Sequence, residues 1–264
     1  MISLKILFWN LAKNSIEISL SQCIIENSID IAILTEFDGI DFEKLQNTLG
    51  EGYVHVIGYY QSGLITLIAR KSLVVSVFRE QDRYVLYKVE TNDCSYIIAG
   101  IHLHDRRSRD ALVRMAKIGR LVNDIKNLEI SYQCKNTIII GDFNANPYDD
   151  ELLAMSAFNS VLFKDEILKS ETRTVDGISY RRFYNPILHF ISEDTKMYGS
   201  YYYSEGSCTP IWHCLDQVLV SKALANNVAK MEYLKSIEGK PLISKVKPNV
   251  TISDHLPLVV TITE

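Results

Sequence analysis

The segment Ile138-Ile139-Ile140-Gly141-Asp142-Phe143-Asn144 joins an apolar run to two polar side chains. An apolar run of this length is typical of a buried strand. Asp142 and Asn144 allow two interpretations, because both residue types also form turns by bonding their own backbone. Ala145-Asn146-Pro147 continues this turn chemistry. The segment alone therefore predicts a strand end that is either a turn or the wall of a site.

Other predicted strands also meet polar side chains at their ends. An apolar run closes on Asn10, on Glu36 and on His102, and Ser253-Asp254-His255 precedes the last strand. Singly, each of these is also explained as a solvated strand end, a turn or a core histidine. Asp216 opens an apolar strand, where a carboxylate needs a partner. Converging strand ends would gather the whole set into one pocket: Asn10, Glu36, His102, Asp142, Asn144, Asp216, Asp254 and His255.

The residue types in this set point to a specific chemistry. Carboxylate and amide oxygens are hard ligands that favour Mg²⁺ or Mn²⁺ over zinc, and no cysteine pair accompanies them at zinc spacing. Histidines beside carboxylates serve as general acids or bases and stabilise charge on a phosphoryl group. Metal-assisted hydrolysis of a phosphodiester uses these parts.

Strand and helix patterns recur along the chain without a linker between them. Strands are expected at residues 4–9, 29–34, 64–69, 73–79, 84–90, 95–101, 137–140, 216–220 and 256–262. Helices are expected at 16–27, at 109–127 and in a short turn after Pro147, whereas 159–210 are expected to hold an insertion with loops. The three strands between 64 and 90 follow one another at hairpin-like spacing. This mixture predicts one α/β domain over residues 1–264, with largely antiparallel sheets covered by helices.

Composition excludes several classes of protein. The chain has 264 residues, a formal net charge of −4 and 47% hydrophobic residues, which is typical of a globular protein. No apolar run approaches the roughly 20 residues needed to cross a bilayer, so no membrane partner is expected. The N-terminal segment lacks the features of a secretory signal, and the five scattered cysteines favour a reduced, cytoplasmic protein. Mild acidity means that nucleic acid must be bound through a local patch or metal ions.

The order of the motifs Trp-Asn, Thr-Glu, Ile-His-Leu, Gly-Asp-Phe-Asn, Leu-Asp-Gln-Val-Leu-Val-Ser and Ser-Asp-His resembles the endonuclease/exonuclease/phosphatase superfamily. This superfamily includes deoxyribonuclease I, exonuclease III-type repair endonucleases, neutral sphingomyelinases and inositol polyphosphate 5-phosphatases. The resemblance extends from Asn10 to His255. It implies a four-layer α/β sandwich, in which two mixed, mostly antiparallel sheets pack face to face between helices.

The resemblance also implies roles for the polar residues. Glu36 would be the main metal ligand, with Asn10 beside it, and Asp254 would hold a second metal or support the site. Asp142 would orient or deprotonate the attacking water. Asn144 would hold that water and a phosphate oxygen. The cofactor implied is Mg²⁺ or Mn²⁺.

Two histidines complete the implied site. His255 would act on the scissile phosphate as an acid–base group or charge stabiliser, with Asp216 fixing its tautomer. His102 would be the second imidazole at the phosphate. Thr35 stands where the family often has Gln, and Ala12 stands where repair endonucleases commonly have an acidic residue. Together with His102, Ala12 makes abasic-site repair the less favoured branch.

Substrate contacts are predicted from basic and aromatic clusters, each of which has a structural alternative. Arg106 and Arg107 follow His102 and form either a phosphate-binding edge or a solvated helix start. Arg181 and Arg182 are interleaved with aromatic residues that could stack bases. Tyr202 lies in a run of three tyrosines that is also explained as an aromatic strand edge. His213 is not expected to bind a metal.

The function predicted is a Mg²⁺- or Mn²⁺-dependent phosphodiesterase, and specifically a nuclease acting on DNA. One alternative is hydrolysis of a phospholipid or inositol phosphate by the same site. A second is a catalytically inactive binding module, which the presence of all eight pocket residues disfavours. The sequence identifies no protein partner and excludes none.

Overall fold

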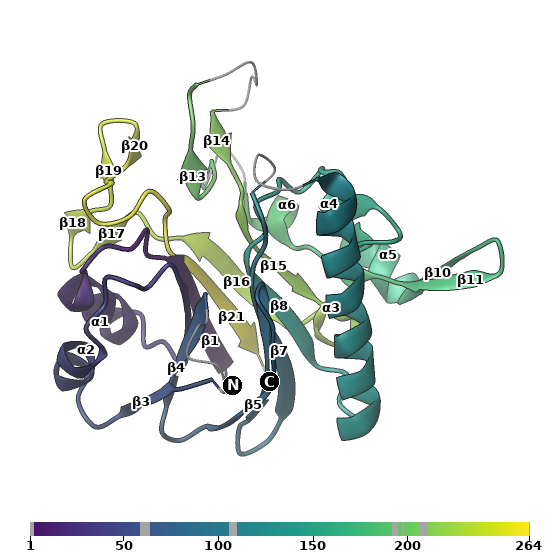
Figure 1. The fold of residues 1–264 in the computed structure, drawn as a ribbon, viewed down its shortest axis with the longest axis horizontal. Helices are drawn as coiled ribbons and strands as arrows, with labels where there is room; N and C mark the ends of the chain where they lie inside the picture. Colours follow the sequence, from purple (N-terminus) through teal and green to yellow (C-terminus); the bar gives the residue numbers. More distant parts are fainter. Residues whose placement is uncertain are drawn as a thin grey trace.

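Two large β-sheets face each other at the centre of the computed structural model, and helices cover their outer faces (Figure 1). The structure describes residues 3–58, 64–105, 110–191, 195–196, 198–205 and 211–263. In order through the molecule, the four layers are a pair of helices, the first sheet, the second sheet and a long helix. The predicted α/β sandwich of mixed, mostly antiparallel sheets is confirmed.

The first sheet, called sheet A here, has the strand order β16-β21-β1-β2-β4-β3. Its only parallel pair among the described strands is β1 with β2. Its outer face is covered by α1 and α2, which contribute Leu20, Ile24 and Leu45 to the core. The bounds are β1 Ser3–Asn10, α1 Glu17–Glu26, β2 Ile31–Thr35, α2 Phe42–Leu49, β3 Tyr53–Val56, β4 Ile65–Arg70, β16 Val228–Tyr233 and β21 Leu258–Thr263.

The second sheet, sheet B, has the order β5-β6-β7-β8-β15-β12-β9. Its parallel pairs are β7 with β8 and β12 with β9. The long helix α3 covers its outer face and begins at Asp110, whose carboxylate caps the backbone N–H of Leu112. The bounds are β5 Val74–Glu80, β6 Tyr84–Glu90, β7 Ser95–His102, α3 Ala111–Tyr132, β8 Thr137–Asp142, β9 Ser160–Val161, β12 Phe183–Tyr184 and β15 Asp216–Val220.

Short elements occupy the connections. Four small hairpins are formed by β10 (Thr172–Val175) with β11 (Ile178–Arg181), β13 (Tyr201–Tyr202) with β14 (Trp212–His213), β17 (Ser236–Ile237) with β18 (Lys240–Pro241), and β19 (Ile243–Ser244) with β20 (Lys247–Pro248). The short helices are α4 (Asp150–Leu153), α5 (Lys164–Lys169), α6 (Ile187–Phe190) and a 3₁₀ turn at Lys222–Leu224. No helix of the described residues is long and apolar enough to span a membrane.

The three isoleucines of β8 are buried on both faces of sheet B. Ile138 and Ile140 belong to the core between the sheets, whereas Ile139 belongs to the core under α3. The sheets approach closely at Gly100 of β7, where an added Cβ would lie 2.9 Å from Ile33 Cγ2 and 3.1 Å from Ile65 Cγ2. Gly100 therefore permits the close approach of sheet B to sheet A.

Every strand predicted from the sequence is present, with ends shifted by a few residues. The short spacing between β4 and β5 suggested a hairpin, but the two strands do not pair. Only Lys71–Leu73 separate them, yet the chain crosses there from sheet A to sheet B. The region 159–210 is more regular than expected, since β9 and β12 extend sheet B. The elements α2, β3 and β16 were not predicted.

We predict that Gly100→Ala lowers the free energy of unfolding by about 1–3 kcal/mol, the usual cost of overpacking a core. The matched control is Gly52→Ala, because a Cβ at Gly52 meets nothing within 4 Å. Urea unfolding of both variants tests this. Equal stability of the two variants would show that the sheets can separate at no cost.

Candidate active site

Strand register brings the predicted residues to one edge of the sandwich. Within sheet B, Asp142 at the end of β8 lies opposite His102 of β7 and opposite Asp216 of β15. Within sheet A, Asn10 lies opposite Thr35, and Glu36 follows. A cavity of about 530 Å³ opens at this edge. It is lined by seven of the eight predicted residues: Asn10, Glu36, His102, Asp142, Asn144, Asp254 and His255.

The Gly-Asp-Phe-Asn segment is both a turn and the wall of the cavity. A Cβ on Gly141 would lie 2.0 Å from the carbonyl oxygen of Ile101, so only glycine fits before Asp142. Asn144 adopts the left-handed region with φ of 48°. Its backbone N–H donates to Asp142 Oδ1 at 2.8 Å, and its side-chain Nδ2 donates to Leu103 O at 2.9 Å. The turn thus fixes the Asp142 carboxylate.

Asn10 holds two carboxylates that come from different sheets. Its Nδ2 donates to Glu36 Oε1 at 3.2 Å and to Asp142 Oδ2 at 3.4 Å. Its Oδ1 accepts the backbone N–H of Ala12 at 3.0 Å, which fixes the amide orientation. Glu36 has φ of 48°, a conformation that costs free energy for a residue other than glycine and that concentrates at functional sites. Asn10 therefore positions Glu36 and Asp142.

His255 and Asp216 form a buried pair behind the cavity. The distance from His255 Nδ1 to Asp216 Oδ2 is 2.7 Å. The Trp9 indole N–H donates to His255 O at 3.0 Å, and the Tyr201 ring lies 4.8 Å from the imidazole. Burial lowers the pKa of His255, but the Asp216 carboxylate and the charges of Asp142 and Asp254 outweigh it and raise the pKa to about 10. In the metal-free protein His255 is therefore an imidazolium whose Nδ1–H points at Asp216.

His102 has the opposite protonation state. Its Nε2 lies 3.7 Å from both Glu36 Oε1 and Asp142 Oδ2, and its buried Nδ1 has no hydrogen-bond partner. Burial, followed by the nearby charges of Arg83 and His255, lowers the pKa of His102 to about 4. The two predicted histidines thus differ at neutral pH, with His102 neutral and His255 cationic.

The site carries more negative charge than its own groups neutralise. Burial and the charge of Asp216 raise the pKa of Asp142 to about 7. Asp216 Oδ1 is buried without a hydrogen-bond partner. Asp142, Asp216 and His255 offer ligand atoms that all lie within 4.8 Å of one another. Hard oxygen donors with an orphaned lone pair fit a divalent cation.

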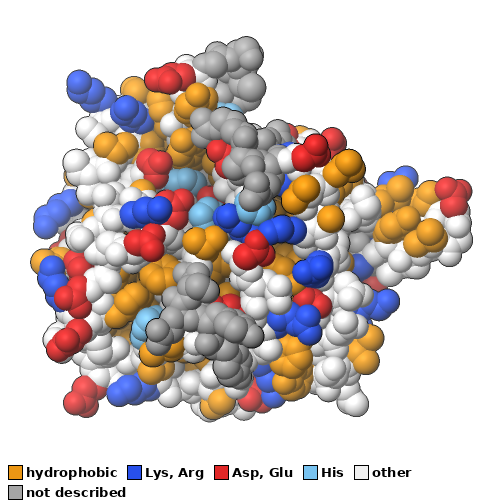
Figure 2. Space-filling view, viewed as in Figure 1, with side chains coloured by type: hydrophobic (Ala, Val, Ile, Leu, Met, Phe, Trp, Pro, Cys, Tyr) orange, Lys and Arg blue, Asp and Glu red, His pale blue; other side chains and the backbone are white. Residues whose placement is uncertain are grey.

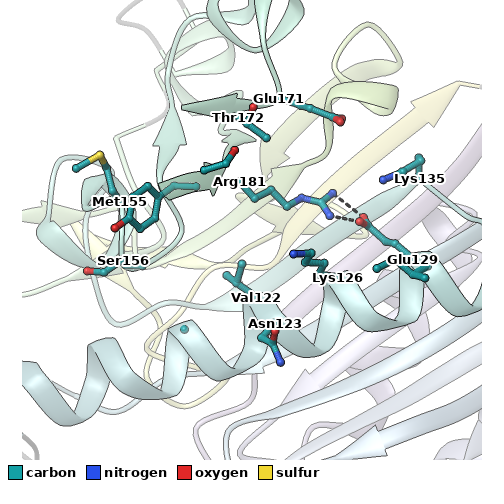
Figure 3. Close-up of a pocket in the computed structure, with 15 residues that line it drawn as sticks. Val122, Asn123, Lys126, Glu129, Lys135, Met155, Ser156, Glu171, Thr172 and Arg181 are labelled. Atoms are coloured by element: carbon teal, nitrogen blue, oxygen red, sulfur yellow. Dashed lines mark hydrogen bonds and ion pairs between the residues drawn. The ribbon is translucent and has the colours of Figure 1, made fainter. Parts of the chain in front are cut away.

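The structure does not bring the predicted β11 arginines to the active-site cavity. The Arg181 guanidinium pairs with the buried Glu129 carboxylate of α3, in a different cavity of about 570 Å³ (Figure 3). Arg182 donates to Glu166 Oε2 at 2.8 Å. The reason is that β11 pairs with β10 in a hairpin beside α3. Arg106 and Arg107 lie outside the described residues.

Tyr202 also misses the cavity, although its neighbours Tyr201 and Tyr203 line it. Side chains alternate along a strand, so Tyr202 points to the other face of β13. There its ring meets Trp212 edge-on at 5.4 Å. The tyrosine run therefore borders the cavity through Tyr201 and Tyr203, whereas Tyr202 does not line it, and substrate contact by this run stays a prediction.

Several cavity residues were not predicted. Arg83 lies in the β5–β6 turn, where its carbonyl accepts the backbone N–H of His102 at 3.1 Å.

His213 lines the cavity with Nδ1 at 3.0 Å from Asn146 Nδ2. Asn146 Oδ1 accepts the backbone N–H of Cys214, so Nδ2 is the donor and the His213 proton lies on Nε2. A single arginine in a turn carries no sequence signal, whereas Asn146 and His213 flank recognisable motifs. The remaining ionisable residues of the cavity that were not predicted are His104, Asp105 and Asp149.

Two facing mixed sheets with this polar edge define the α/β sandwich of deoxyribonuclease I-like proteins. The chain belongs to the endonuclease/exonuclease/phosphatase family, whose model matches residues 7–255. Members of this family are metal-dependent phosphoesterases and nucleases. The resemblance read from the motifs is therefore confirmed.

Solved structures share the fold at low sequence identity. A family member from Bacteroides thetaiotaomicron superposes with a TM-score of 0.62 at 13% identity, covering 98% of this chain and 97% of that chain. D. rerio TDP2 in complex with a single-stranded DNA product gives 0.58 at 13% identity, covering 100% of both chains. The Neisseria 3′ phosphatase NExo, bound to a product DNA hairpin, gives 0.53 at 14%, covering 99% of this chain and all of the other. No curated protein matches the chain in sequence.

We predict that the two imidazoles titrate far apart in the metal-free protein. Throughout the neutral range His255 stays protonated, because its pKa lies near 10, and His102 stays neutral, because its pKa lies near 4. Asp216→Asn removes the largest of the charges that raise the His255 pKa, so this pKa should fall. Proton–nitrogen NMR of the imidazoles measures both values. A neutral His255 at pH 7 in the unsubstituted protein would contradict the Asp216 pairing.

Proposed function

We propose that the protein is a divalent-metal-dependent phosphodiester hydrolase that cleaves DNA. The observation that carries this proposal is the arrangement at the sheet edge. Asn10 holds Glu36 and Asp142 together, and one neutral and one cationic imidazole flank these carboxylates. An acidic pair beside imidazoles of opposite charge suits attack of water on an anionic phosphodiester.

Glu36 is the principal candidate to hold the cation, with Asn10 and Asp254 as supporting groups. The Glu36 side chain is 30% exposed toward the cavity, whereas Asp216 is fully buried behind His255. His255 Nδ1 already bonds Asp216, so that nitrogen is not free to bind metal. Bound Mg²⁺ or Mn²⁺ would polarise a phosphoryl oxygen and lower the pKa of water.

The remaining groups move protons or stabilise charge. Asp142 is the candidate base for the attacking water, since a pKa of about 7 suits proton abstraction at neutral pH. His255 would offer its Nε2–H to the phosphate or the leaving oxygen, with Asp216 fixing the ring. Neutral His102 would donate or accept one hydrogen bond at the phosphate. Asn144 acts through Asp142, because its backbone N–H donates to Asp142 Oδ1 and its side-chain Nδ2 donates to Leu103 O and Asp142 Oδ2.

Two considerations support DNA as the substrate. The similar structures include TDP2 with a single-stranded DNA product and NExo with a DNA hairpin. The cavity also combines a basic group, Arg83, with the aromatic rings of Tyr201 and Tyr203. Basic and aromatic side chains together suit phosphates and bases. A cytoplasmic location and a single domain over the whole chain remain predictions.

We predict that the purified protein nicks supercoiled plasmid with Mg²⁺ or Mn²⁺ and not with EDTA. Asp142→Asn should abolish nicking because the amide cannot accept the proton of the attacking water. Asp165→Asn in α5, an exposed aspartate remote from the cavity, is the matched control and should retain full activity. Metal-independent nicking, or full activity of Asp142→Asn, would refute the proposal. Inactivity on plasmid, linear duplex, single-stranded DNA and RNA would redirect it to phospholipid or inositol phosphate substrates.

We predict that His255→Ala lowers kcat by roughly 10²–10⁴-fold, the contribution of a positioned acid–base group. His189→Ala, at an exposed histidine of α6, is the matched control and should leave kcat unchanged. Turnover of a short oligonucleotide at saturating substrate measures the effect, and circular dichroism verifies folding. Near-normal kcat in a folded His255→Ala protein would remove His255 from the chemistry.

A further inference from the structure

A separate cavity of about 360 Å³ lies on the other side of the β13–β14 ribbon from the active-site cavity. Side chains alternate along β14, so His213 lines the active-site cavity and Trp212 lines this one. The two cavities also meet at the end of the Ser-Asp-His motif. Its last residue, His255, lines the active-site cavity, and the next residue, Leu256, lines the second cavity. We call this second space the Trp212 cavity.

The Trp212 cavity combines aromatic rings with positive charge. Tyr198, Trp212 and Tyr233 line it together with Lys196, Lys235 and Lys245, and none of the described residues that line it is a carboxylate. This composition stands out in a chain with a net charge of −4. The Lys235 ammonium lies 5.9 Å from the centroid of the Tyr198 ring and donates to the backbone carbonyl of Lys196. Figure 2 shows basic and hydrophobic side chains side by side over the neighbouring β19–β20 hairpin, at the upper left.

We propose that the Trp212 cavity binds an unpaired nucleotide of the DNA strand whose scissile phosphate lies in the active-site cavity. This inference rests on the proposed function and extends it to the form of the substrate. Aromatic rings stack on a base, and ammonium groups attract the phosphates on either side of it. A base inside a duplex is already stacked on both faces, so the cavity favours a single strand or a frayed end. A recess does not suit a lipid bilayer, which presents a broad surface.

The β13–β14 ribbon separates the two cavities, and its neighbouring residues His213 and Trp212 face one cavity each. In the proposed complex, one nucleotide lies in the Trp212 cavity and the same strand passes the ribbon to reach His255 in the active-site cavity. The ribbon orders the substrate without contributing to the hydrolysis itself.

Tryptophan fluorescence tests this, because the chain has two tryptophans and the part of the response that Trp212→Phe abolishes is that of Trp212, not of Trp9. Titration with a short single-stranded oligothymidylate in EDTA, where no cleavage occurs, should quench Trp212. A blunt duplex of the same length should bind more weakly and cause little quenching. Trp212→Ala should weaken binding of the single strand about tenfold, the scale of one base–aromatic stack. Trp212→Phe should retain most of the affinity.

A charge variant gives an independent measurement that does not depend on the packing of Trp212. Lys245→Ala should reduce the slope of log affinity against log salt by about 0.7, the value for one phosphate contact on a single strand. The matched control is Lys222→Ala, because Lys222 follows the opposite end of β15 from Asp216. Its salt slope should not change. Circular dichroism of each variant verifies folding.

The proposal is overturned if the oligonucleotide leaves Trp212 fluorescence unchanged, or if duplex and single strand bind equally. It is also overturned if anionic phosphatidylserine vesicles, and not oligonucleotides, change the emission. Because binding is measured in EDTA, it is independent of catalysis. Plasmid cleavage without a Trp212 response would refute this site alone. Binding at Trp212 without metal-dependent cleavage of any DNA would refute DNA hydrolysis and leave the nucleotide site standing.

Discussion

Asp142 and Asp216 lie directly opposite each other at the ends of two paired strands, and both are buried. Two buried carboxylates this close together repel each other, and they cannot both remain ionised without a positive charge nearby. The His255 imidazolium supplies one such charge through Asp216. Asp142 is left with a raised pKa, amide donors and no cationic hydrogen-bond partner. This uncompensated carboxylate is what makes the edge of sheet B suited to a cation and to proton abstraction.

The second half of the site depends on how closely the sheets pack. Glu36 belongs to sheet A and Asp142 to sheet B, yet both accept hydrogen bonds from one Asn10 amide. Such a bridge needs the two sheets at a fixed spacing. Gly100 keeps that spacing by leaving room for Ile33 and Ile65 within the core. The hydrophobic core and the acidic cluster are therefore linked, because packing between the sheets sets the distance between carboxylates from different layers.

The sequence predicted the strand ends well, because most of them join an apolar run to a polar residue. Seven of the eight polar residues singled out in this way line the cavity, and Asp216 lies behind it; their roles stay predictions. The sequence could not predict register. Register decides that Tyr201 and Tyr203 face the active-site cavity while Tyr202 faces away. Nor could composition show that Arg181 is paired with a buried Glu129, since that partner lies 52 residues away on α3. Arg83 is the opposite case, because it lines the cavity but was not predicted. A turn places it beside His102, and no sequence motif marks an arginine in a turn.

The β13–β14 ribbon is a common wall of the two cavities. Because side chains alternate along its strands, each cavity meets a different set of residues. On one side, Tyr201 and His213 meet the acidic cluster, where charge and proton position matter. On the other side, Trp212 faces lysines, where stacking and long-range attraction matter. A change at Trp212 leaves the hydrogen bonds of Asn146 to His213 and of His255 to Asp216 untouched. If both proposals hold, substrate selection and hydrolysis can vary independently at this edge, because Trp212 and His213 point to opposite faces of the same ribbon.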